Sequence, residues 1–409
     1  MAVGMQQSTM RISLLIRAGL LTLAMAPTPL AARAPAIARL DGSQISRDRV
    51  DTIVTEAMKA AHVTGAGVTI FNAGQPVYMK TYGVCDAARN LPFTSDSVVT
   101  AASLTKTAFA VMVMQLVQDG IIDLDKPVFR YLPRPLPEYP PYRDLAADPR
   151  YRQITMRMLL DHTSGFPNWR RFTDDRKLRI YFPPGSRFAY SGEGIALAQM
   201  VVETVTGKSV DALMHARLFG PLGMTQTSMV WEPRFEHNLC NGYNEQGRSL
   251  GPERRRKGDA AGSMQTTLRD YSRFVSAILS GKLLDARMRA LMFRPQIRIE
   301  TAHEFPSLST DTTTENNDIR LSYGLGWGLY FSPFGEAFFK EGHDEGWRHY
   351  VVCFEKPRSG VLIMTNSSNG EDIYSTILEE TFADTYTPLE WEGFKPREKL
   401  PQTPALRKP

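Results

Sequence analysis

Alternating apolar and polar residues near the start of the chain predict a β-hairpin. The stretches GAGVTIF and PVYMKTYGV alternate with a period of two, and the turn residues NAGQ separate them. We therefore expect two antiparallel strands at about residues 66–83. Four later stretches, YGLGWGLYF, EAFFKEGH, WRHYVVCFE and GVLIMTNSS, also predict antiparallel strands, and EDIYSTILEETFAD predicts a closing helix.

Between the two strand regions the pattern is mostly helical. The stretch AASLTKTAFAVMVMQLVQDG, residues 101–120, is apolar on every side from Phe109 to Met114, which is typical of a helix at the centre of a domain. From residue 125 to about 280, helical segments alternate with Pro-rich loops, and PRPLPEYPPYRDLAADPRY is too rich in proline and tyrosine for regular structure. Strands at both ends with helices between them predict an α+β fold whose antiparallel sheet uses both chain ends.

The central helix carries a lysine where a helix usually has an acid. Ser103 is a suitable N-cap, but the third residue after it is Lys106 instead of Glu or Gln. Burial lowers a lysine pKa by about 3 to 5 units, whereas the helix dipole supplies only about 0.3 to 1 kcal/mol, so a neutral amine at pH 7 requires desolvation, helped by another cation nearby. A neutral Lys106 one turn from Ser103 could take its proton and make Ser103 a nucleophile. The alternative is an ordinary helix cap with an outward-facing lysine.

Aromatic residues supply further candidates for a site. In PPGSRFAYSGEG, Tyr190 precedes small residues, and beside a lysine its phenol could share a proton. The alternative is a core aromatic with a satisfied hydroxyl. We also expect four aromatic residues near the same cleft, with core packing as the alternative for each: Tyr139, Tyr142, Trp169 and Tyr181.

Composition and charge narrow the setting. The 409 residues are 43% hydrophobic and 22% charged, which suits a globular protein with a large core. The first 34 residues carry three arginines and no acid, with an apolar run at 18–26 followed by small residues. This pattern predicts a signal peptide within residues 1–38, starting at about residue 10, and hence a periplasmic or secreted protein. The run is too short to span a membrane, so we expect no stable membrane anchor after signal removal.

Charge and cysteine usage argue against several other functions. Without the three leader arginines the formal net charge falls from +5 to +2, which removes the main support for nucleic-acid binding. The basic run at residues 254–257 is interpreted as a solvated loop, with an anion site as the alternative. Cys85, Cys240 and Cys353 lack metal-ligand spacing and allow at most one disulfide, whose pairing stays open. We expect no cofactor and no metal.

Seven ordered motifs then carry a resemblance. They are SLTK (103–106), LLDHTSGFP (159–167), PPGSRFAYS (183–191), FGPLGMTQT (219–227), AAGSMQTTLRDYSRF (260–274), YGLGWG (323–328) and EGHDEGW (341–347). In this order they resemble the serine β-lactamase-like family, which includes class C β-lactamases, D,D-peptidases and family VIII carboxylesterases. The resemblance spans about residues 47–385.

The resemblance implies a sheet flanked by helices with an inserted all-helical lobe, and an active site where the two meet. The expected catalytic domain is a single bipartite unit at 39–388. Its sheet region covers about 39–125 and 258–388, its lobe covers about 126–257, and a loosely held Pro/Lys-rich tail follows at 389–409.

The resemblance also assigns roles to individual residues. Ser103 takes the nucleophile's place, Lys106 that of the base and Tyr190 that of the proton-relaying tyrosine. His343 stands where the family has a Lys or His on an edge strand. The oxyanion hole uses the Ser103 N–H and a second N–H near Glu345 or Gly346. Asp161 and His162 are interpreted as residues that fix a loop.

Two departures from the family pattern bear on the substrate. Gly192 stands where the family commonly has an Asn whose amide helps hold acylamide substrates, and we expect it to open room. Glu345 stands where the family commonly has a Gly, and either Glu345 or Gly346 then lines the oxyanion hole. We therefore expect an exported serine hydrolase that forms an acyl-enzyme on Ser103, most simply a carboxylesterase for small-molecule esters with a short acyl group or an aromatic side.

Two other functions stay open alongside the esterase. One is a D,D-peptidase or β-lactamase that acts on cell-wall peptides or β-lactams. The other is a penicillin-binding sensor or structural protein without turnover. The sequence leaves the oligomeric state open.

Overall fold

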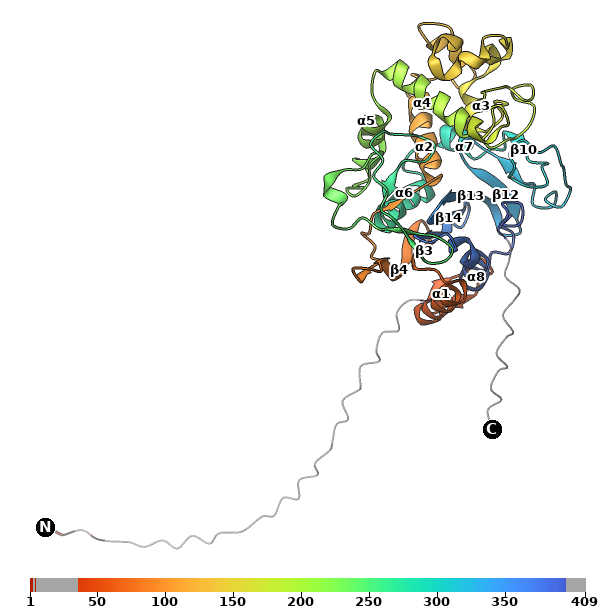
Figure 1. Cartoon of the computed structure of the whole chain (residues 1–409). Coiled ribbons are helices and arrows are strands. Elements are labelled where there is room, and N and C mark those ends of the chain that lie inside the picture. The colour runs from red at the N-terminus through yellow and green to blue at the C-terminus, as the bar shows by residue number, and fades with distance from the viewer. Residues whose placement is uncertain (3, 5–35, 395–409) are drawn as a thin grey trace. The chain divides into compact units, whose positions relative to one another are not determined.

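A nine-stranded antiparallel sheet forms the centre of the computed structural model, which describes residues 1–2, 4 and 36–394 (Figure 1). The strand order is β10-β11-β12-β13-β14-β15-β3-β4-β5. The bounds of these strands are β3 Gly65–Asn72, β4 Gln75–Asp86, β5 Leu91–Pro92, β10 Ile297–Arg298, β11 Ser322–Tyr323, β12 Gly328–Ser332, β13 Gly335–Asp344, β14 Trp347–Phe354 and β15 Ser359–Thr365.

Strands from the two ends of the chain meet inside this sheet. The predicted hairpin is β3 and β4, and β15 pairs with β3 so that Val361 lies opposite Ile70. The prediction of an α+β fold whose antiparallel sheet uses both chain ends is therefore confirmed. Because the sheet is covered on both faces, β14 and β15 are buried along their whole length, which explains why their sequences are almost continuously apolar.

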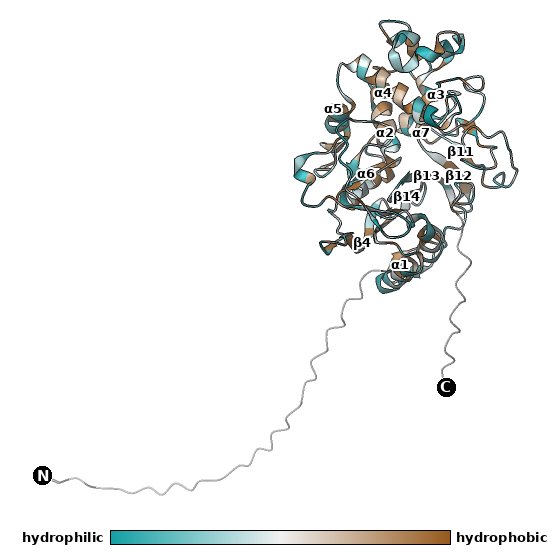
Figure 2. Ribbon diagram, viewed as in Figure 1, coloured by the Kyte–Doolittle hydropathy of each residue, from teal (hydrophilic) through white to brown (hydrophobic). Residues whose placement is uncertain are grey.

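Helices cover the two faces of the sheet (Figure 1). One face packs against α1 (Arg47–Ala61) and α8 (Tyr374–Ile377), whose apolar residues share a core with Val352. The other face packs against α2 (Leu104–Gln118) and α6 (Leu268–Leu279), whose core includes Val351. α1 carries both polar and apolar residues in Figure 2, whereas α2 is buried on nearly every side, as its sequence predicts.

The inserted region is mostly helical but contains one small hairpin. Its α-helices are α3 (Met156–Leu160), α4 (Gly192–Thr206) and α5 (Val210–Met214), and α7 (Ala286–Met292) follows α6. The Pro-rich stretch predicted to be irregular forms short 3₁₀ turns at Leu136–Glu138, Pro140–Leu145 and Pro149–Gln153. The expected lobe is not all-helical, because β7 (Gly242–Tyr243) pairs with β8 (Ser249–Gly251) around the turn at Gly247.

Two further two-stranded pairs tie distant segments together. β1 (Ile37–Ala38) pairs with β2 (Gln44–Ile45), and β6 (Val99–Thr100) pairs with β9 (Gln265–Thr266). The second pair places the residues just before α2 beside those just before α6. Of the predicted signal peptide, residues 3 and 5–35 lie outside the described part of the chain, whereas Ile37 is a buried strand residue of the folded domain.

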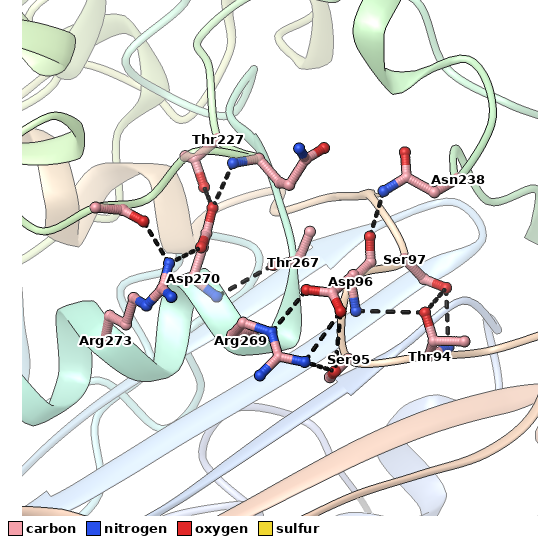
Figure 3. Close-up of polar contacts among 12 residues, drawn as sticks. Thr94, Ser95, Asp96, Ser97, Thr227, Asn238, Thr267, Arg269, Asp270 and Arg273 are labelled. Atoms are coloured by element: carbon pink, nitrogen blue, oxygen red, sulfur yellow. Dashed lines mark hydrogen bonds and ion pairs between the residues drawn. The ribbon is translucent and has the colours of Figure 1, made fainter.

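A polar junction around Asp270 holds the start of α6 in place (Figure 3). Thr267 caps the helix by accepting the Asp270 N–H at 3.1 Å, and the Asp270 carboxylate accepts the Thr227 hydroxyl at 3.0 Å. One residue earlier along α6, Arg269 binds Asp96 at 2.7 Å. Two of the motifs that carry the family resemblance, around 227 and 267, therefore form a joint between the inserted region and the sheet region.

Two further features concern the cysteines and the C-terminal end. Cys85 at the end of β4 forms a disulfide with Cys240, and Cys353 is free and buried. The expectation of a loosely held tail after Pro388 is wrong for residues 389–394, because Leu389, Trp391 and Phe394 are buried in the core beside α8. Residues 395–409 lie outside the described chain. No helix among the described residues is long and apolar enough to span a membrane.

Candidate active site

Ser103 lies on a tight turn between β6 and α2. The residue before it, Ala102, has φ 47°, a left-handed conformation that is rare for alanine and typical of functional turns. Ser103 is the N-cap residue of α2, as predicted, but within the described chain its side chain makes no capping hydrogen bond. Its Oγ instead lies 2.9 Å from Lys106 Nζ and 2.8 Å from the Tyr190 hydroxyl. The structure therefore brings the three candidate catalytic residues together.

Lys106 is buried where its neutral form is favoured. Its side chain is 2% exposed, and Nζ donates to the Ala261 carbonyl oxygen at 2.5 Å, which leaves the amine aimed at Ser103 Oγ. Burial, and next the nearby charge of Lys340, lower the pKa of Lys106 to about 7. Lys340 is thus the second cation that we expected to help keep Lys106 neutral. A substantial fraction of the amine is therefore available as a base at neutral pH.

Tyr190 stays protonated and supplies a hydrogen-bond donor. Burial, followed by the charge of Glu341, raises its pKa well above the usual value, so the residue is a phenol at neutral pH. Its hydroxyl donates to Ser103 Oγ. The ring packs against His162 at a centroid distance of 4.6 Å, and His162 Nδ1 accepts the Ser191 N–H. The buried His162 therefore fixes both the ring and the backbone beside it.

The buried pair Lys340 and Glu341 lies beside the Tyr190 ring. Lys340 Nζ lies 4.7 Å from the centroid of this ring, and Lys106 Nζ lies 4.9 Å from it. Lys340 is 1% exposed and forms an ion pair with Glu341. A single tyrosine ring thus contacts two lysines, of which only Lys340 has a carboxylate partner in direct contact.

β13 brings backbone groups next to Ser103. Strand β12 pairs with residues 335–339 of β13, so residues 340–344 extend past it. At Gly342 a Cβ atom would lie 2.8 Å from the Ala101 oxygen, and glycine is therefore needed for β13 to approach the start of α2. His343, with half of its side chain exposed, lies on this segment and lines the cleft.

Glu345 and Gly346 form the two-residue turn between β13 and β14 and do not continue the strand. Gly346 has φ 81°, and its N–H donates to Ser368 Oγ at 2.9 Å. The Glu345 N–H donates to Asp344 at 2.9 Å, while its exposed side chain lines the cleft. Both N–H groups that we expected near the oxyanion hole therefore already donate hydrogen bonds within the protein. These two residues fall between the strands predicted from EAFFKEGH and WRHYVVCFE, and the turn that joins those strands uses both N–H groups.

Gly192 does not open room in the cleft, which corrects our expectation. A Cβ atom at this position would lie 2.4 Å from the Trp169 ring, so the tryptophan already fills the space. The Gly192 N–H donates to Asn168 Oδ1 at 3.1 Å. A side-chain amide, that of Asn168, therefore lies beside Gly192 although position 192 itself has none.

The cleft that contains Ser103, Lys106 and Tyr190 has a volume of about 760 Å³, and a side cavity of about 370 Å³ adjoins it. The two cavities share Asn168, Trp169, Phe172 and Phe305 as lining residues. Of the aromatic residues expected near the site, Trp169 lines both cavities and Tyr181 the side cavity, whereas Tyr142 is buried in the core and Tyr139 packs against it. The cleft thus has polar residues around Ser103, and the side cavity that adjoins it is lined by aromatic residues.

The model of the Beta-lactamase family matches residues 50–379. The chain belongs to the Beta-lactamase family. The esterase EstB of Burkholderia gladioli is a relative at 29% identity, over 48% of this chain and 54% of EstB. The alignment thus spans about half of EstB.

Two other comparisons show similarity to penicillin-binding proteins. Penicillin-binding protein 4 of Amycolatopsis lactamdurans is 27% identical over 83% of this chain and 89% of that protein. A solved structure of an octameric penicillin-binding protein homologue from Pyrococcus abyssi matches with a TM-score of 0.67 at 20% identity, over 82% of this chain and 77% of that one. The relatives of this chain thus include both an esterase and penicillin-binding proteins, and the Beta-lactamase family to which it belongs is a family of serine hydrolases.

Several residues of this Beta-lactamase family site escaped the sequence interpretation. Arg255, assigned to a solvated basic loop, lines the cleft and binds Glu253 at 2.5 Å and Asp344 at 2.8 Å. Glu304 and Glu392 line it as well, from the loop after β10 and from the expected tail. Isolated charged residues far apart in the sequence carry no periodic signal, and only folding brings them together.

Proposed function

We propose that this protein is an exported serine hydrolase that forms an acyl-enzyme on Ser103. The observation that carries the proposal is the contact of Ser103 Oγ with a buried lysine of pKa about 7 and with a protonated tyrosine. A nucleophile, a base and an acid within hydrogen-bond distance are the minimum set for acyl transfer.

In acylation, neutral Lys106 takes the Ser103 proton while Oγ attacks the substrate carbonyl carbon. The tetrahedral oxyanion is held by the Ser103 N–H and by a second N–H from the 340–344 segment of β13. When the bond to the leaving oxygen breaks, Tyr190 donates its proton to that oxygen and regains one from the Lys106 ammonium. Deacylation reverses these transfers, with water in place of the leaving alcohol. No net proton is gained or lost by the pair.

Esters with a short acyl group or an aromatic side are the preferred substrates in this proposal. Trp169, Phe172 and Tyr181 line the side cavity that adjoins the cleft, and they suit an apolar or aromatic group of an ester. Gly192 offers no side-chain amide of its own for an acylamide. The similarity to EstB, an esterase, supports the same choice.

A D,D-peptidase or β-lactamase activity is the second candidate. It is favoured by the similarity to penicillin-binding protein 4, which extends over more of the chain than that to EstB. The Asn168 amide beside Gly192 is the group that could hold an acylamide in this case.

Export is supported by two observations. The arginine-bearing apolar leader is typical of a signal peptide, and the Cys85–Cys240 disulfide is typical of proteins in oxidising compartments. Export can be tested by fractionation of the native host, or by fusing the leader to a reporter protein and measuring its cleavage and location. An unprocessed reporter fusion that stays in the cytoplasm would contradict it.

One substrate panel tests the activity. Wild type, Ser103→Ala and Lys106→Arg are assayed with p-nitrophenyl butyrate, nitrocefin and a D-Ala-D-Ala peptide, each beside fluorescent penicillin labelling. We expect ester hydrolysis that both substitutions abolish, because alanine offers no nucleophile and arginine stays protonated and cannot act as a base. A higher kcat/KM for the peptide than for the ester would reverse our ranking of the two candidates. Penicillin labelling without any turnover would instead identify a sensor.

A further inference from the structure

Three glutamates converge on the floor of the Ser103 cleft from three separate segments. Glu304 comes from the loop after β10, Glu341 from β13 and Glu392 from the C-terminal segment, and all three line the cleft. They are 3%, 5% and 6% exposed, and one carboxylate oxygen of each lies within 4.8 Å of the others. The Glu304 N–H donates to the Trp391 carbonyl oxygen at 2.9 Å, which joins two of the three segments.

Two of these carboxyl groups lack a cation. Lys340 is the ion-pair partner of Glu341. Among residues 36–394, neither Glu304 nor Glu392 has an ion-pair partner, and Glu304 Oε2 and Glu392 Oε1 are buried without any hydrogen bond. Glu392 Oε2 accepts the Tyr350 hydroxyl at 2.6 Å. A buried carboxyl oxygen without a partner is costly, so its presence beside an open cleft points to a ligand.

A hydroxyl group outside this acidic set points to the same place. Tyr323 is 2% exposed, and its hydroxyl has no hydrogen-bond partner within the described chain. The Tyr323 ring lies 5.0 Å from that of His162, which packs against Tyr190 beside the same cleft, and burial, followed by the charges of Glu341 and Glu304, raises the pKa of Tyr323 well above its usual value. The unpartnered polar atoms thus come from two carboxyl groups and one phenol.

The surrounding charges favour a cation as the ligand. Asp344 and Glu371, two other carboxylates of the cleft, are paired with arginines at 2.8 Å. Glu304 and Glu392 are the buried ones left without such a partner within the described chain. An alkylammonium group has three N–H donors, which matches two carboxyl oxygens and the Tyr323 hydroxyl. A divalent metal would have to share the site with the Lys340 ammonium that already occupies Glu341.

We propose that Glu304, Glu392 and Tyr323, with Glu341 held by Lys340, form a subsite of the Ser103 cleft that binds the ammonium group of a substrate. This deepens the proposed function, since it adds a cationic group to the ester or acylated substrate. Lys340 contacts the ring of Tyr190, whose hydroxyl donates to Ser103 Oγ, and the three glutamates line the same cleft as Ser103, so the ammonium group binds in the cleft that holds the nucleophile.

The test measures binding, so that it does not depend on hydrolysis. Calorimetric titration with n-hexylammonium and with 1-hexanol compares two ligands of equal chain length that differ in charge. We expect the wild type to bind the ammonium at least about tenfold more tightly, as charge-assisted hydrogen bonds predict. Glu304→Gln/Glu392→Gln should lose most of this preference, and the single Glu304→Gln serves if the double variant fails to fold.

The matched control is Glu345→Gln, which removes an exposed carboxylate at the same cleft and should keep the preference within about twofold. Equal affinity for the two ligands in the wild type, or a preference that survives in Glu304→Gln/Glu392→Gln, would overturn the subsite. Calcium or zinc ions alone are titrated in parallel. Tight binding of one such ion that the double variant loses would overturn the ammonium assignment in favour of a metal site. Absence of ester hydrolysis in the wild type would contradict the proposed acyl-enzyme on Ser103, whereas the binding measurements would still test the ammonium subsite.

Discussion

Replacing Lys340 by methionine should change the pH dependence of the enzyme without touching Ser103. Lys340 and Lys106 both lie over the ring of Tyr190, and the charge of Lys340 is the largest cause after burial of the lowered Lys106 pKa. Methionine matches the length of lysine and removes the charge. The variant therefore measures how much of the lowered pKa of Lys106 is due to the neighbouring charge of Lys340.

The size of the effect follows from the geometry. With 4.9 Å and 4.7 Å from the ring centroid, the two amines are at most about 10 Å apart, so at an effective dielectric constant of about 20 their repulsion is at least about 1.7 kcal/mol. This corresponds to slightly more than one pKa unit. Because the lowered pKa keeps Lys106 neutral, activity falls as the pH drops through about 7, and Lys340→Met should move this midpoint up by about one pH unit.

The assay is kcat/KM for p-nitrophenyl butyrate between pH 5 and pH 9, with a thermal melt of each variant to verify folding. Its apparent midpoint belongs to the coupled Lys106 and Tyr190 pair. Lys340→Met/Glu341→Gln should shift the midpoint less, since it also removes the attraction of Glu341. Lys80→Met, which removes a half-exposed lysine of β4, is the matched control and should leave it in place. An unchanged or lowered midpoint in Lys340→Met would refute the reasoning.

Three further predictions concern stability and packing. Lys106→Met should abolish the acyl-enzyme burst, yet the variant should unfold no more easily than the wild type at pH 7. Wild-type stability should rise between pH 7 and about 10.5, because in that range Lys106 binds a proton only in the unfolded chain, and Lys106→Met should remove this rise. Urea melts across that range measure the difference. Reduction of the Cys85–Cys240 disulfide, which closes 155 residues, should lower the free energy of unfolding by up to about 5 kcal/mol, measured by melts with and without dithiothreitol. Gly192→Ala should lower both stability and kcat because its Cβ meets Trp169, and Trp169→Ala should restore stability in the double variant; additive losses would contradict the contact.

Periodic and local signals were enough to predict most of the fold. The apolar positions of β3 and of α2 each fall within one continuous stretch of sequence, so each stretch carries its own signal although the side chains pack against other elements. The hairpin of β7 and β8 was missed because its strands have only two and three residues, too few to alternate. The burial of Trp391 and Phe394 was missed because the Pro-rich, charged residues around them are typical of a loose tail.

The candidate site was predictable where its chemistry lies within one motif. Lys106 three residues after Ser103 already suggests a base beside a nucleophile, and the structure places the two in contact. A neutral Lys106 predicts a second cation nearby, but the sequence could not identify it as Lys340, because Lys340 lies on a strand more than 200 residues away. The Trp169 ring over Gly192 is likewise a contact between segments, which glycine in a sequence does not reveal.

The central claim is a covalent acyl group on Ser103, and trapping that group tests it most directly. Wild type and Ser103→Ala are mixed with p-nitrophenyl butyrate, quenched in acid within the burst phase, digested and analysed by mass spectrometry. The account predicts a butyryl group on the peptide that contains Ser103 in the wild type and no such group in Ser103→Ala. A butyryl group on another residue, or full ester hydrolysis by Ser103→Ala, would contradict it.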